Sequence, residues 1–249
     1  MEAKIPSTST ALTALLKTDF TTQWRNRRSV ILVLLVPVII LISWKPVAAK
    51  LGGPFVLASC ITIGLTAIGL MGYANAVARD RDKGVFQRLR IAPIQTWTIM
   101  ISRLCVQLFM IVLITTLVFF VGSNQDHIEL TASGYAISYF TAIIGGAVYL
   151  GLGQMIVGLL KNAETVNSTS RLVYFVFIMV GMFGDLGLLG KQMKSVVHWS
   201  PYGTVKTILA AGMNPQSWNT DASMALLISV VYALIFSVLG IKWFRWNVK

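Results

Sequence analysis

Charged side chains are scarce in this sequence. They make up 12% of its 249 residues, about half the share of an ordinary soluble domain. Hydrophobic residues make up 55% of the chain, and its mean hydropathy is +0.72. These values exclude an ordinary soluble domain. They predict an all-α, polytopic membrane protein in which residues 1–249 form a single transmembrane domain.

Residues that bind metals or form cross-links are also few. The chain has two cysteines, Cys60 and Cys105, and two histidines, His127 and His198. Both cysteines fall inside hydrophobic runs, and both histidines fall outside them. Because a zinc site needs a cluster of such ligands, we expect no metal site and no intramembrane metalloprotease.

A phosphate-binding loop is missing as well. The stretch most similar to this motif runs from Asp185 to Gln192. Asp185 stands where the motif needs its first glycine. Gln192, directly after Lys191, stands where the motif needs a Ser or Thr that binds magnesium. We therefore expect no ATP hydrolysis by this chain, no catalytic residues and no cofactor of its own.

Basic residues greatly outnumber acidic ones. There are 21 Lys and Arg against nine Asp and Glu, so the net charge is +12. In a soluble protein this excess would suggest nucleic acid as a partner. In a membrane protein it is better explained by cytoplasmic loops that face anionic lipid. Membrane lipid is therefore an expected partner, and nucleic acid is not.

Six hydrophobic segments are long enough to cross a bilayer. We expect the spans at 30–49, 54–78, 104–123, 135–160, 172–190 and 222–241. The fourth region is glycine-rich in its second half, which predicts close helix packing or a break. Most of the Lys and Arg fall in the loops that six spans would place on the side of the N-terminus. By the positive-inside rule both termini are then cytoplasmic.

Residues 10–24 precede the first span and are amphipathic. Leu12, Leu16, Phe20 and Trp24 recur every four residues, so they share one face of a helix. Such a helix is expected to lie flat in the membrane interface.

The segment ARDRDKGVFQRLRIAP, residues 78–93, separates spans two and three. Its apolar residues Val85, Phe86 and Leu89 lie at helical spacing, and Pro93 stops a helix. We predict one short amphipathic helix over 79–92, bound to the membrane surface at both ends. An ordinary basic loop on the cytoplasmic side is the alternative.

The residue order in this segment resembles the signature of the type-2 ATP-binding-cassette (ABC) transporter permeases. The matching residues are Asp80, Arg81, Asp82, Lys83, Gly84, Val85, Phe86, Arg88, Leu89 and Pro93, preceded by Arg79. Asp stands where the family usually has Glu, and Gln87 stands where a further acid is common. The resemblance therefore assigns no specific ion pair.

The outer segment 191–221 supports the same resemblance. Its core contains His198, Trp199, Ser200 and Pro201. The Ser-Pro pair and the apolar run after it resemble the family's Asn-Pro segment, which forms short outer helices before the last span. An ordinary interfacial turn containing proline is the alternative.

The resemblance implies a complex in the cell membrane. Two permeases, identical or related, would pair and recruit separate ABC ATPase subunits, which hold ATP and Mg. The helix over 79–92 would dock in the ATPase as a coupling helix. The complex would export a drug-like, antibiotic or lipid-like amphipathic molecule, as in multidrug efflux. A non-transporting sensor, immunity or assembly protein with the same fold is the alternative function.

In the family, spans two and five face the partner permease and line the transport path. The candidate path residues here are Thr66, Leu70, Asn75, Phe175, Phe177, Met179, Met182, Phe183 and Asp185. Each of them could instead serve helix packing or contact lipid.

Asp185 is the one acid inside a predicted span, where an ionised carboxylate is costly. It could pair with Lys191 or Lys194, or it could contact cationic cargo.

Overall fold

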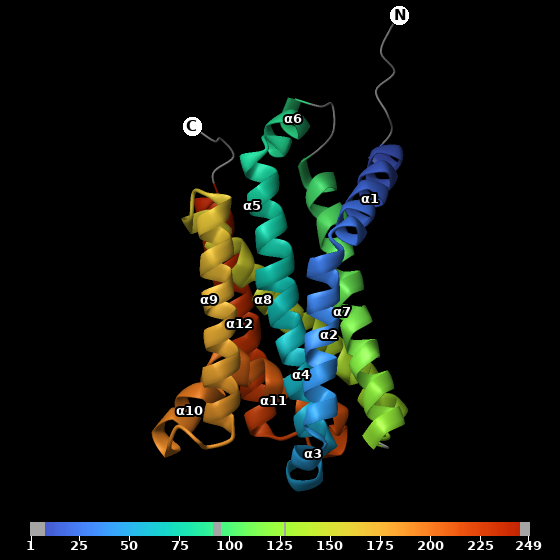
Figure 1. Ribbon diagram of the computed structural model, residues 1–249, viewed down its shortest axis with the longest axis vertical. Coiled ribbons are helices and arrows are strands. Elements are labelled where there is room, and N and C mark those ends of the chain that lie inside the picture. Colours follow the sequence, from blue (N-terminus) through green and yellow to red (C-terminus); the bar gives the residue numbers. More distant parts are fainter. Residues whose placement is uncertain (1–7, 92–95, 127, 245–249) are drawn as a thin grey trace, which may run out of the picture.

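A computed structural model describes residues 8–91, 96–126 and 128–244 of the chain, and all regular structure in these ranges is helical (Figure 1). The helices are α1 (Thr8–Arg25), α2 (Arg27–Ser43), α3 (Lys45–Leu51), α4 (Gly53–Ala67), the π-helix η1 (Ile68–Ala74), α5 (Asn75–Asp82), α6 (Val85–Ile91), α7 (Thr96–Asp126), α8 (Ala132–Leu159), α9 (Ala163–Asp185), α10 (Lys191–Trp199), α11 (Pro201–Met213), the 3-10 helix η2 (Pro215–Ser217) and α12 (Thr220–Trp243).

Five of these helical segments are long and apolar enough to cross a membrane. They are Gly53–Asp82, Thr98–Asn124, Ala132–Leu159, Ala163–Gly184 and Thr220–Trp243. The bent pair formed by α1 and α2 could supply a sixth span. The prediction of an all-helical, multi-pass membrane protein is confirmed, with five or six candidate spans.

The long helices run side by side, and their connections gather at two ends (Figure 1). α1, α5 and α6 lie at one end, where α12 also finishes. α3, α10 and α11 lie at the opposite end. We call the first end the α6 end and the second the α11 end.

The second span is one continuous helical segment, from Gly53 to Asp82, with the π-helix η1 in its middle. At this point it packs very closely on α8. A Cβ added at Gly69 would lie 2.3 Å from the carbonyl oxygen of Tyr149, and one added at Gly153 would lie 2.4 Å from that of Gly69. The two glycines therefore allow the backbones to touch. A π-turn inside an α-helix often marks a functional region.

α8 lies at the centre of the bundle, where it packs against η1, α7, α11 and α12. Its glycines face these neighbours. A Cβ at Gly145 would meet Val205, one at Gly146 would meet Ile111, and one at Gly158 would meet the backbone of Gly240. The predicted close packing is confirmed. The alternative of a break is wrong, because α8 is unbroken from Ala132 to Leu159.

The first and fifth spans have different bounds from those predicted. The helix predicted over 30–49 ends at Ser43, and α3 begins afresh at Lys45 with Pro46 in its first turn, a position that suits proline. α9 begins at Ala163 rather than at 172, because its polar first turns are helical too, and it ends at Asp185 rather than at 190.

The outer segment forms the short helices that the sequence predicts, but α11 is not a surface helix. It packs against α4, α8 and α12, and most of its residues are buried. Even Lys206 is buried, with Nζ 3.3 Å from the centre of the Phe55 ring. This burial was not predicted from the sequence, because the whole segment between spans five and six was expected to lie outside the membrane.

Candidate coupling site at the α5–α6 turn

The charged segment after span two forms two helices rather than the single helix predicted over 79–92. Gly84 has φ +66°, a left-handed conformation that glycine adopts easily and that commonly ends helices. The amide nitrogens of Lys83 and Gly84 donate to the carbonyl oxygens of Arg79 and Arg81, both over 3.0 Å. Span two therefore ends at Asp82, and α6 begins at Val85 in a new direction (Figure 1).

Arg81 is the most deeply placed charge of this segment. Its side chain is 3% exposed. Nη1 donates to the carbonyl oxygen of Val157 over 2.6 Å, and Nη2 donates to that of Lys161 over 2.7 Å. Val157 lies in the last turn of α8, whose last carbonyls have no partners within the helix, and Lys161 lies in the connection between α8 and α9. Arg81 therefore joins the end of span two to the α8–α9 connection.

Asp82 acts on the same connection from the other side. Its Oδ2 accepts a hydrogen bond from the amide nitrogen of Ala163 over 2.8 Å. Ala163 is the first residue of α9, where the helix dipole favours negative charge. Together, Arg81 and Asp82 hold the end of α8 and the beginning of α9.

Asp80 ties the segment to α7. Arg103 Nη2 donates to Asp80 Oδ2 over 2.5 Å. One residue earlier on α7, Ser102 donates to Asp19 Oδ2 on α1 over 2.5 Å. Through Asp80, Arg103, Ser102 and Asp19, neighbouring contacts connect span two, α7 and the N-terminal helix.

Phe86 does not form part of an outward apolar stripe. It is buried, its ring lies edge-to-face on Phe244 with centroids 5.6 Å apart, and the guanidinium carbon of Arg103 lies 4.8 Å from its centre. In this structure Phe86 therefore packs within the permease. The stripe was found by its spacing, which does not reveal what the stripe faces.

The exposed surface of the turn is polar and carries both signs of charge. It is formed by Arg79, Asp82, Lys83, Gln87 and Arg88, and we call it the turn surface. Val85 is half-buried at its edge. The side chain of Leu89 and the whole of Pro93 lie outside the described residues. Arg88 Nη2 donates to the carbonyl oxygen of Lys83 over 2.8 Å, which ties α6 to the turn.

A second feature is a cavity of about 610 Å³ between α2, the η1–α5 segment and α9. Of the candidate path residues, Asn75 lines it. Asn75 donates through Nδ2 to the carbonyl oxygen of Met71 over 3.0 Å, while its Oδ1 is buried without a partner in the described structure. The cavity lies towards the α6 end, beside Arg79 and Glu164.

The other candidate path residues lie in different environments. Thr66 and Leu70 are buried within the chain, and Thr66 donates to the carbonyl oxygen of Thr62 over 2.7 Å. Phe177 lies edge-to-face on Tyr149. Met179 and Met182 are half-buried, and Phe183 and Phe175 are exposed on α9. Asp185 is the last residue of α9, and its side chain lies outside the described structure.

Several residues that line this cavity were not predicted from the sequence. Met71 lies one turn before Asn75, and Asn167, Arg171 and Tyr174 lie on one face of α9. Their spacing of three to four residues was visible in the sequence. Asn167 and Arg171 were missed because the polar beginning of α9 was read as a loop.

The outer segment is fixed by local hydrogen bonds. Ser200 caps α11 by accepting from the amide nitrogen of Gly203 over 3.3 Å, and Pro201 is the first helical residue. His198 Nε2 lies 3.0 Å from Asp221 Oδ1 at the beginning of α12. The hydroxyl of Tyr232 donates to the carbonyl oxygen of Trp199 over 3.0 Å. These contacts tie α10 and α11 to the last span. In the part of the chain that the structure describes, no group of three or more His, Cys, Asp or Glu could hold a metal.

The long apolar helices, with charged turns at their ends, define a multi-pass membrane protein. The family profile described as "ABC-2 type transporter" matches residues 10–205, and the chain belongs to this family. It is the membrane permease, a non-catalytic component of an ABC transporter, and the family implies pairing with an ABC ATPase.

Two curated relatives agree with the family. The chain is 23% identical over 175 residues to "Putative transport permease YvfS" of Bacillus subtilis (strain 168), and the match covers 69% of each chain. It is 31% identical over 126 residues to "Probable multidrug ABC transporter permease YbhR" of Escherichia coli (strain K12). That match covers 50% of this chain and 33% of the E. coli protein.

Proposed function

We propose that this permease belongs to an ATP-driven exporter that moves an apolar or amphipathic small molecule out of the cell. The main support for this proposal is the structure of the turn at Gly84. Arg81, Asp80 and Asp82 hydrogen-bond to other spans of the same chain. The other charged residues of the turn surface are exposed.

The turn surface is the proposed docking site of the ATPase. The polar residues Lys83, Gln87 and Arg88 offer hydrogen bonds and charge to a soluble partner, as is usual outside an interface core. Force on α6 would pass through Arg81 and Asp82 to the α8–α9 connection, and through Asp80 to α7. These contacts are direct hydrogen bonds. A shift of the turn must therefore move the contacted spans or break the hydrogen bonds.

The proposed transport path begins at the cavity between α2, η1–α5 and α9. Its lining joins apolar residues such as Val36 and Met71 to polar ones such as Asn75 and Asn167. Pockets of this mixed kind suit drug-sized amphipathic molecules. The E. coli protein named "Probable multidrug ABC transporter permease YbhR" is a distant relative, which supports a substrate of this class.

A second permease copy is the proposed partner in the membrane. α2 and α9 flank the path cavity and carry exposed apolar side chains, among them Leu32, Leu35, Phe175 and Phe183. A second copy, identical or related, would close the cavity from this side. In this arrangement six spans cross the cell membrane, α1 lies in the interface, and the α6 end with both termini faces the cytoplasm.

The docking proposal is tested with the permease and its ATPase purified as a complex. The double variant Lys83→Glu/Arg88→Glu reverses two charges on the turn surface, and Lys50→Glu reverses one exposed charge on α3 at the α11 end. We expect the double variant to recover less ATPase and to lose hydrolysis stimulated by amphipathic compounds, while Lys50→Glu behaves as the wild type.

Equal ATPase recovery and equal stimulation in all three proteins would contradict the docking proposal. A stable complex that hydrolyses ATP but responds to no compound, and moves none in vesicles, would instead favour the sensor or assembly function.

A further inference from the structure

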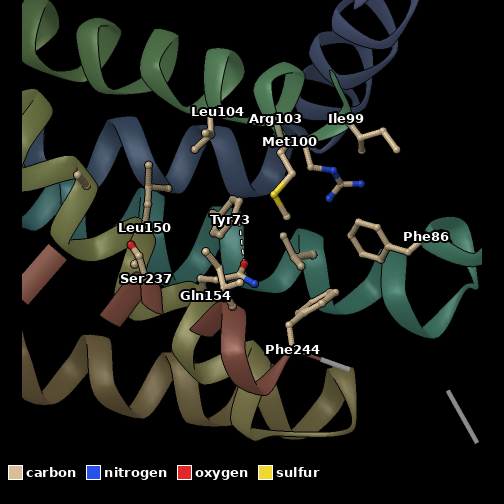
Figure 2. Close-up of a pocket in the computed structure, with 14 residues that line it drawn as sticks. Tyr73, Phe86, Ile99, Met100, Arg103, Leu104, Leu150, Gln154, Ser237 and Phe244 are labelled. Carbon is tan, nitrogen blue, oxygen red and sulfur yellow. Dashed lines mark hydrogen bonds between the residues drawn. The ribbon is translucent and has the colours of Figure 1, made fainter. Parts of the chain in front are cut away.

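A second cavity lies on the face of the bundle away from the proposed path. It has a volume of about 480 Å³, a size typical of small-molecule sites. α7 forms one wall, α8 and α12 form the opposite wall, and the η1–α5 segment with Tyr73 forms the floor (Figure 2). Val77 of the same segment also lines the cavity. Most of the residues around it are apolar.

The cavity opens towards the lipid. Leu104 of α7 and Ile241 of α12 line it, yet their side chains are 50% and 63% exposed. Its open side therefore lies between these two helices, both of which are candidate membrane spans. Inside a bilayer, the acyl chains of the lipids would lie against this apolar opening.

The end of the cavity nearest α6 carries one charged side chain, Arg103. Phe86 of α6 and Phe244 beyond α12 meet there edge-to-face, and Figure 2 shows Arg103 beside them. Tyr73 donates to Gln154 Oε1 over 2.8 Å across the floor. Arg103 Nη2 is bound to Asp80, but its Nε is buried and has no partner among the described residues.

An unsatisfied donor next to an apolar slot suits an amphiphile with an oxygen-bearing head. A guanidinium keeps several N–H donors when one nitrogen is paired, and phosphate or ester oxygens are good acceptors for it. Leaving such a donor buried without a partner is costly, so a bound oxygen atom would be stabilising.

We propose that this cavity binds one glycerophospholipid from the bilayer. One acyl chain occupies the slot between α7 and α8–α12, and a phosphate or ester oxygen accepts from Arg103 Nε. The lipid would brace Phe86, and so α6, from the membrane side. This site is separate from the proposed substrate path, which lies between α2 and α9.

The test uses the permease–ATPase complex in nanodiscs that contain phosphatidylglycerol with a photoactivatable diazirine on one acyl chain. After irradiation, adducts are mapped by mass spectrometry. We expect labelling at Met100, Leu104 and Leu150 to exceed that at Leu234, an exposed lipid-facing residue of α12. Because labelling reports occupancy, the result does not depend on ATP hydrolysis or transport.

Ala147→Trp plugs the cavity from α8, since Ala147 lines it and is exposed. The matched control is Ala136→Trp, an exposed position three turns away on α8 that does not line the cavity. We expect the plug to remove cavity labelling and the control to keep it. If Ala147→Trp fails to assemble, Leu104→Trp plugs the cavity from α7.

Arg103→Lys keeps a positive charge near Asp80 but removes Nε. We expect phosphatidylglycerol labelling to fall about five-fold, the effect of losing roughly 1 kcal/mol of hydrogen bonding, and labelling by a diazirine fatty acid to change less. Cavity labelling no higher than at Leu234, or unchanged by the plug, would overturn the proposal. Equal labelling by both probes, unaffected by Arg103→Lys, would overturn the phospholipid assignment.

Discussion

Arg81 Nη1 donates to the carbonyl oxygen of Val157 over 2.6 Å, although the two residues are 76 positions apart in the sequence. The bond joins the last turn of span two to the last turns of α8. A charge that the sequence suggested for an external partner is therefore used to hold two spans of the permease together.

We predict that Arg81→Ala weakens this junction. The change removes two hydrogen bonds from a charged donor to buried carbonyls, so we expect the free energy of unfolding to fall by about 2–4 kcal/mol. Arg79→Ala, at an exposed neighbouring position, is the control and should have little effect. Thermal unfolding of both variants in detergent measures the difference, and equal melting temperatures would contradict the assigned role of Arg81.

Gly84→Ala is expected to impair coupling more than stability. A side chain at φ +66° costs about 1–2 kcal/mol. Gly187→Ala is the matched control, because Gly187 has φ +75° and lies in open space at the α11 end. Both variants should lose similar stability.

Only Gly84→Ala should reduce compound-stimulated ATP hydrolysis by the complex, since it alters the direction of α6. The same loss of hydrolysis in Gly187→Ala would mean that backbone strain, and not the turn, is responsible.

Gly153→Ala is expected to separate span two from α8. The added Cβ would lie 2.4 Å from the carbonyl oxygen of Gly69, and backbone atoms cannot move aside as a flexible side chain can. Overpacking of this kind typically costs about 1–3 kcal/mol. Gly72→Ala is the control, because its nearest neighbour would lie 3.9 Å away. Size-exclusion profiles and melting temperatures compare the two, and an unaffected Gly153→Ala would contradict the close contact.

The main elements of this fold could be predicted from the sequence. Long apolar runs predict the spans because the bilayer sets their length. The glycines of α8 predicted close helix packing, and the structure shows which neighbours make it, Val205 and Ile111 among them. The polar beginning of α9 was missed because hydropathy does not detect helical turns that lie outside the apolar region. Its capping partner, Asp82, lies 81 positions away.

The candidate site was predicted only in part. The charged segment was found, and Gly84 within it carried a visible signal for a helix end, yet the amphipathic spacing favoured one continuous helix. Spacing also could not show that Phe86 faces Phe244 inside the permease, since an apolar stripe is the same whether it faces a partner or the chain's own core.

The proposed orientation is tested by cysteine labelling in intact cells. Exposed Cys105 is first replaced by serine. Ser217→Cys at the α11 end should then react with a membrane-impermeant maleimide, and Gln87→Cys on α6 should react only after the cells are opened. Labelling of Gln87→Cys in intact cells would mean that the α6 end faces outward.

Contact between the turn surface and the ATPase is the central claim, and site-specific photo-crosslinking tests it most directly. A photoreactive amino acid replaces Gln87 on α6 or Gln216 at the α11 end, both at exposed positions. The account predicts a covalent permease–ATPase adduct from position 87 and none from position 216. An intact complex that gives no adduct from position 87, nor from the neighbouring positions 83 and 88, would contradict it.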